Sequence, residues 1–105
     1  MKIQEVPDFS DVGFYVERAM ITYGKYWAAQ QTVTSIEAKA LEAAQGHAQA
    51  QSAILTNIRT PGGWDYKVHT TNRNSYMRQI EIDTAMAMML MQAYSRYPGD
   101  NMEPR

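Results

Sequence analysis

The 105-residue chain has no cysteine, and its only prolines are Pro7, Pro61, Pro98 and Pro104. The lack of cysteine excludes disulfide bonds and thiolate metal ligands. No proline interrupts the chain between Asp8 and Arg59, so a strong helix breaker is missing from about half of it. An excess of one charge is missing too, because 10 Lys and Arg balance 11 Asp and Glu. No overall basic field therefore attracts nucleic acid or anionic lipid.

Long hydrophobic runs and catalytic motifs are also absent. The longest apolar run, from Ala85 to Met91, is far shorter than the roughly 20 residues that a membrane helix needs. Residues 1–8 lack an apolar signal region, so we expect neither a membrane span nor a cleavable secretory signal. His47 and His69 are the only histidines and do not have metal-site spacing. With no nucleophile motif and no phosphate loop, we expect a non-enzymatic protein without catalytic, cofactor-binding or metal-binding residues.

Two stretches of the chain have the pattern of helices. The first covers residues 9–59, with apolar residues at helical spacing from Val12 to Trp27 and an alanine-rich part after them. The second covers residues 75–97 and is apolar nearly all round, as in a buried helix. Near residues 30–35, polar and β-branched residues weaken the pattern, and a capping-box spacing follows. The long helix is therefore either broken there or continuous with a polar patch.

These patterns predict an all-α fold, a long helical hairpin in a single domain over residues 1–105. Its predicted parts are an N-terminal arm (1–8), a long helical arm (9–59), an ordered loop (60–74), a shorter C-terminal helix (75–97) and a tail (98–105). Alternating apolar and polar residues from Trp64 to Thr70 predict a short strand or ordered segment in the loop. The arm would span roughly 75 Å and the last helix roughly 35 Å. Either the arm folds back on itself, or other copies of the chain cover its free half.

Charge is distributed unevenly along the chain. From Arg59 to Gln79 four Lys and Arg stand against one acidic residue, and the segments on either side are acidic. Aromatic residues alternate with these basic residues, so we expect the segment to contact an acidic surface of a neighbouring subunit. Arg73 and Arg78 are expected to pair there with carboxylates such as Glu81, Asp83 or those near the N-terminus. The predicted interface residues, two methionines of the last helix included, are Trp64, Tyr66, Lys67, Arg73, Tyr76, Arg78, Met88 and Met89.

The same basic aromatic segment supports a second hypothesis. Aromatic rings that stack on bases, together with cations that bind phosphates, are a common way to hold single-stranded nucleic acid. The alternative function is therefore a small helical module that binds nucleic acid through residues 59–78. Oligomeric state and salt-dependent binding distinguish the two hypotheses.

A short sequence pattern at the predicted loop is shared in part with known proteins. Asn57-Ile58, Thr60-Pro61-Gly62 and Tyr66-Lys67 resemble the Asn-Ile-Ala-Asn...Thr-Pro-Gly-Tyr-Lys signature of flagellar axial rod and hook proteins. The second asparagine is missing, Gly63-Trp64-Asp65 is inserted before the tyrosine, and the family's motif follows a much shorter first helix. The resemblance covers about a dozen residues and implies helices that pack into tubular assemblies.

Together these observations predict a structural subunit that packs with copies of itself or with other assembly proteins. A component of a virion tail, neck or ejection apparatus fits this expectation, and so does a component of a secretion or appendage apparatus.

Overall fold

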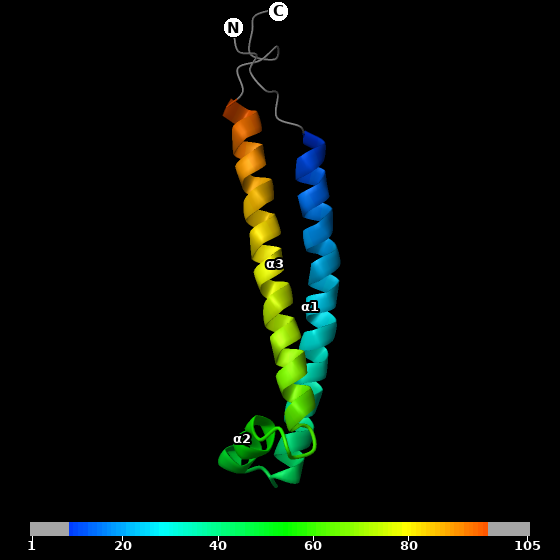
Figure 1. Cartoon of the computed structure of the whole chain (residues 1–105), viewed down its shortest axis with the longest axis vertical. Helices are drawn as coiled ribbons and strands as arrows, with labels where there is room; N and C mark the ends of the chain where they lie inside the picture. Colours follow the sequence, from blue (N-terminus) through cyan, green and yellow to red (C-terminus); the bar gives the residue numbers. More distant parts are fainter. Residues whose placement is uncertain (1–8, 97–105) are drawn as a thin grey trace, which may run out of the picture.

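The computed structural model describes residues 9–96, and these form three α-helices (Figure 1). They are α1 (Phe9–Ala43), α2 (Ala48–Thr56) and α3 (Gly63–Arg96). The two long helices lie side by side and antiparallel, and the short α2 lies at the end where α1 stops and α3 begins (Figure 1). The predicted all-α, hairpin-like fold is confirmed.

The predicted helix lengths are wrong. α1 runs without a break through residues 30–35, which is the continuous alternative, and Thr32 and Thr34 make side-chain hydrogen bonds within it, Thr32 Oγ1 to Ala28 O and Gln30 Nε2 to Thr34 Oγ1. The long arm instead ends at Ala43 and turns back. α3 begins at Gly63, so most of the predicted loop, including the possible strand, is helical. With 35 residues in α1 and 34 in α3, the two helices match, and the half-uncovered arm does not exist.

The turn that ends α1 explains where the chain reverses. Gln45 and Gly46 both have positive φ, +54° and +84°. The Gly46 N–H donates to Leu41 O at 2.9 Å and the Gln45 N–H to Glu42 O at 3.0 Å, which is the Schellman arrangement at a helix C-terminus. A residue with a side chain therefore occupies the left-handed position where glycine is usual.

We expect Gln45→Gly to raise the free energy of unfolding by about 1 kcal/mol, because glycine relieves the strain of the left-handed conformation. Gln31→Gly is the matched control, since Gln31 is exposed in the interior of α1 and glycine there destabilises a helix by about 1 kcal/mol relative to alanine. Urea unfolding followed by circular dichroism measures both changes. Equal losses in the two variants would contradict the assignment of strain to Gln45.

The corner between α2 and α3 is closely packed. Thr60 Oγ1 hydrogen-bonds the carbonyl oxygens of Ile54 and Asn57, both at 2.7 Å. A Cβ atom on the buried Gly63 would overlap the Asn57 carbonyl oxygen and lie 3.1 Å from that of Ile54. Only glycine therefore allows α3 to begin directly against the end of α2.

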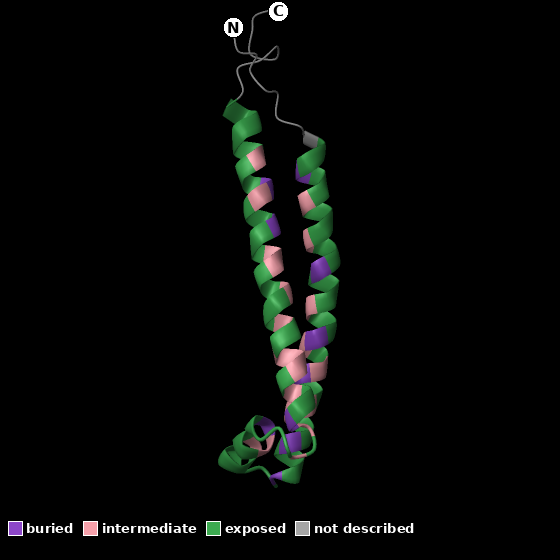
Figure 2. Ribbon diagram, viewed as in Figure 1, coloured by how far each residue is buried: buried purple, intermediate pink, exposed green. Residues whose placement is uncertain are grey.

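The contact between the long helices has the three-four spacing of a coiled coil, and purple and pink segments mark the facing sides in Figure 2. We call the contact the seam. The half-buried or buried seam residues of α1 are Val12, Tyr15, Ala19, Thr22, Tyr26, Ala29, Val33, Ile36 and Ala40. Those of α3 are Tyr66, His69, Arg73, Tyr76, Ile80, Asp83, Ala87 and Leu90. Many of these side chains are small or polar, so the seam alone gives modest hydrophobic stabilisation.

Candidate functional site

Because residues 64–78 are helical in α3, the six predicted interface residues of the basic aromatic segment fall into two groups. Three of them, Tyr66, Arg73 and Tyr76, lie on the seam and face α1, whereas Trp64, Lys67 and Arg78 are exposed. The basic aromatic segment is thus not one continuous surface of the chain.

Two of the seam residues are bound within the chain. The Tyr66 hydroxyl donates to Glu37 Oε2 at 2.9 Å, and Arg73 Nη1 donates to Gln30 Oε1 at 3.1 Å. Burial, followed by this hydrogen bond to Glu37, raises the pKa of Tyr66. These contacts hold α1 and α3 in register, which is a different role from the partner contact expected of Arg73 and Tyr66.

Trp64 and Lys67 lie at the start of α3, at the closed end of the hairpin, whereas Arg78 lies near the middle of that helix. Trp64 and Lys67 line a shallow depression of about 260 Å³ together with Val68, Thr71 and Asn72. Trp64 remains exposed in the first turns of α3. This side chain therefore stays available to a partner.

A carboxylate and a guanidinium cross the seam near its other end. Arg18 Nε and Nη2 donate to Asp83 Oδ2 and Oδ1 at 3.0 and 2.7 Å, and Gln79 Nε2 donates to Oδ1 at 3.1 Å. The Asp83 side chain has no exposed surface, whereas 45% of the Arg18 side chain is exposed. Bonding to Arg18 lowers the pKa of Asp83, against the opposite effect of burial. Asp83 is therefore already paired with Arg18 of the same chain, so it is not a free partner for Arg73 or Arg78.

Arg18 is a residue that the sequence interpretation missed. The available signal was Asp83 itself, because a carboxylate between Ile80 and Ala87 on an apolar stripe needs a partner when it is buried. The Arg18 guanidinium also lies 5.1 Å from the centre of the Phe14 ring and 5.6 Å from that of Tyr15. Arg18 thus covers one flank of the seam.

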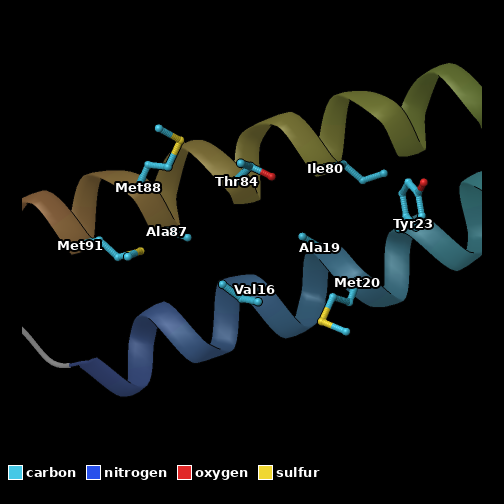
Figure 3. A pocket seen from close by; sticks show the side chains of 9 residues that line it. All are labelled: Val16, Ala19, Met20, Tyr23, Ile80, Thr84, Ala87, Met88 and Met91. Carbon is cyan, nitrogen blue, oxygen red and sulfur yellow. The ribbon is translucent and has the colours of Figure 1, made fainter.

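The opposite flank is an apolar groove of about 500 Å³ (Figure 3). α1 and α3 both contribute side chains to it, and Figure 3 shows most of them directed into the space between the two helices, with Met20 and Met88 directed away from that space. The groove is lined by Val16, Ala19, Met20, Tyr23, Ile80, Thr84, Ala87, Met88 and Met91. No charged side chain lines it, so this strip can leave water without burying an unpaired charge.

An aromatic cluster continues the groove toward the middle of α1. The Trp27 ring meets Tyr23 edge-on at 6.0 Å and Tyr26 edge-on at 5.7 Å, and the two tyrosines stack at 6.3 Å. Tyr23 and Trp27 are nevertheless about half exposed. Large aromatic surface is therefore presented outward next to the groove.

Exposed apolar side chains are concentrated in one half of the hairpin. Of the fifteen exposed large apolar residues in the described part of the chain, all but Leu41, Ile58 and Trp64 lie between Phe14 and Trp27 or between Met77 and Tyr94. Antiparallel packing brings these two segments together. Met88 and Met89, both predicted as interface residues, are among them and are 55% and 61% exposed in the single chain. Exposed apolar side chains concentrated in this way are consistent with contact to a protein partner.

Comparisons with known proteins add no family: no protein-family model, curated protein or solved structure matches the chain. The partial resemblance to flagellar rod and hook proteins stays an expectation from the sequence. Among residues 9–96, no helix combines the length and apolar character required to cross a membrane.

Proposed function

We propose that the protein is a non-enzymatic structural subunit that assembles with copies of itself and with other proteins. The observation that carries the proposal is where the large apolar residues lie, because many of them face water and not the contact between the two helices. Small and polar residues fill much of the seam inside the chain, while twelve large apolar residues lie exposed on the half formed by the start of α1 and the end of α3. Burying a fully exposed side chain of this kind stabilises by about 1.5 to 3 kcal/mol, and these side chains are already about half buried, so each would add about half of that on assembly. Assembly would thus supply stability that the seam lacks.

The exposed apolar half gives this proposal its physical basis in place of the uncovered arm expected from the sequence. Two matched helices form a single layer, and one layer leaves the outer surfaces of both helices in water. A second layer of helices completes a bundle of the kind in which four helices share one core. Virion components such as tail, neck or ejection proteins, and components of secretion or appendage machines, are the assemblies that we propose for it.

Sedimentation velocity across a hundredfold range of protein concentration tests the proposal. We expect the sedimentation coefficient to rise with concentration and the melting temperature to rise with it, because association stabilises the folded chain by mass action. Raising the salt concentration should leave most of the association intact, since apolar contacts are not screened. A compact monomer with a concentration-independent melt would contradict the proposal. Salt-sensitive binding of that monomer to single-stranded nucleic acid would support the alternative module.

The exposed part of the basic aromatic segment gives a separate prediction. We expect Trp64→Ala to weaken contact with a partner protein while leaving helix content unchanged, because Trp64 is exposed and aromatic side chains often dominate interface energy. Arg78→Glu should weaken it further at low salt, because Arg78 is exposed and would meet acidic groups.

Light scattering at low and moderate salt measures this effect on higher assembly. Arg73→Glu is unsuitable as a partner test, because Arg73 bonds Gln30 within the chain and its loss would disturb the hairpin itself. Unchanged assembly in both the Trp64 and the Arg78 variant would remove this surface from the interface.

A further inference from the structure

We infer that the apolar groove is the contact surface for a second copy of this chain, whose own groove lies against it so that the two hairpins form a four-helix bundle. This inference rests on the proposed function and specifies which surface self-association uses. Area, charge and the placement of the groove support it.

The exposed area of the groove side comes up to the lower limit of what a stable dimer buries. Its six large residues are Val16, Met20, Tyr23, Trp27, Met88 and Met91, with exposed fractions from 42% to 69%. Taking about 200 Å² for each, of which about half is exposed, they present roughly 600 Å². Two copies would bury about 1,200 Å² in total, which reaches the range of specific, stable interfaces.

Charge distinguishes the groove from the opposite flank. In a two-fold symmetric contact each patch meets a copy of itself, so a patch that carries one sign of charge repels its partner. The opposite flank, with exposed Phe14, Ile21 and Met89, also carries the exposed Lys25 and Arg18, whose side chain is 45% exposed and bonded to Asp83. The groove lining has no charged residue. Self-contact through the groove therefore buries no charged side chain, whereas self-contact through the other flank would take Lys25 and the exposed part of Arg18 out of water.

The segments outside the described residues offer little to fill the groove. Residues 1–8 contain only Met1, Ile3 and Val6 as large apolar residues, and residues 97–105 contain only Tyr97 and Met102. Charged residues, glutamine, asparagine, glycine and proline separate them. A second hairpin, in contrast, brings a continuous strip of the same length and chemistry.

Two neighbouring methionines provide a matched test on the full chain. Met88 lines the groove, Met89 lies one residue further on the opposite flank, and the two have similar exposure, 55% and 61%. Met88→Glu should weaken dimerisation by at least about 30-fold, because a charge would enter the apolar contact. Met89→Glu should change the dissociation constant of the dimer by less than about threefold, which is the size of an effect at the rim of an interface. Sedimentation equilibrium gives both dissociation constants, and circular dichroism checks that both variants keep the parent's helix content.

A second measurement uses the lack of cysteine in the chain. We expect the thiol of Met20→Cys, on the groove side, to react with a soluble thiol reagent more slowly at associating concentrations than at high dilution, and the thiol of Ile21→Cys, on the other flank, to react at about the same rate in both. Met20 and Ile21 are 69% and 57% exposed in the single chain, so exposure alone does not separate them.

The outcomes separate this inference from the proposed function. If Met89→Glu dissociates the assembly and Met88→Glu does not, the chain self-associates through the other flank, and the groove inference is wrong while the proposed function stands. Equal effects of the two changes would also overturn it. A monomeric parent in which the Met20→Cys thiol reacts slowly with a soluble reagent would mean that the chain's own ends cover the groove. A parent that neither self-associates nor joins other proteins would contradict both.

Discussion

Gly63→Ala is expected to lower the free energy of unfolding by about 3 kcal/mol or more, at the upper end of what overpacking costs. The added Cβ would overlap the carbonyl oxygen of Asn57 and crowd that of Ile54. Both are backbone atoms at the end of α2, so relief requires the start of α3 to move and not merely a side chain to rotate. Such a movement would shift the register that Tyr66 and Glu37 help to fix across the seam.

Gly24→Ala is the matched control for this change. Gly24 lies in the interior of α1, where a new Cβ meets no atom within 4 Å. Alanine there should stabilise the helix by about 0.5 to 1 kcal/mol. The same chemical substitution thus has opposite expected signs at the two positions. Urea unfolding at one fixed protein concentration measures both, because association also contributes to the result. A loss below about 1 kcal/mol in the Gly63 variant, small for overpacking, would show that α3 can start elsewhere at little cost.

The sequence predicted helix type well and helix ends poorly. Apolar spacing and the lack of proline were sufficient to predict an all-α hairpin, because those signals extend over many residues. The end of α1 was missed because Gln45 adopts a positive φ that sequence statistics associate with glycine. The start of α3 was missed because the alternation from Trp64 to Thr70 suggested a strand. Tyr66 and His69 are in fact spaced three apart on the seam, and contact with α1 favours the helix there.

For the candidate site, sequence reasoning found residues but not their neighbours. It selected Met88 and Met89 from an apolar run, yet only the antiparallel register shows that one lines the groove and the other does not. It selected Arg73 and Tyr66 as partner contacts, although both hydrogen-bond to α1. Pairings between residues far apart in sequence depend on register, and no local pattern specifies it. Arg18 and Asp83, 65 positions apart, are the clearest example.

The unequal burial of this ion pair gives the second large expected effect. Arg18→Met should destabilise the hairpin more than Asp83→Leu. The first change leaves a carboxylate with no exposed surface and only Gln79 as a hydrogen-bond donor. The second leaves a guanidinium that is 45% exposed and already packed on two aromatic rings, so it can turn to water. Combining both changes should recover much of the loss, because two apolar side chains then meet on the seam.

The pH dependence of stability provides an independent check on the Arg18 variant. In the parent the folded pKa of Asp83 lies below its unfolded value, chiefly through bonding to Arg18. Its contribution is therefore complete above the unfolded pKa of about 3.9 and is lost as the pH falls through the folded pKa. Without Arg18, burial raises the folded pKa above the unfolded one, so acidification to the unfolded pKa favours the folded variant. The stability gap between parent and Arg18→Met should narrow as the pH falls from 7 toward about 3.5, below the reference pKa of aspartate. Urea midpoints across that range measure the gap, and a constant gap would show that Arg18 acts through its packing on Phe14 and Tyr15 and not through the carboxylate.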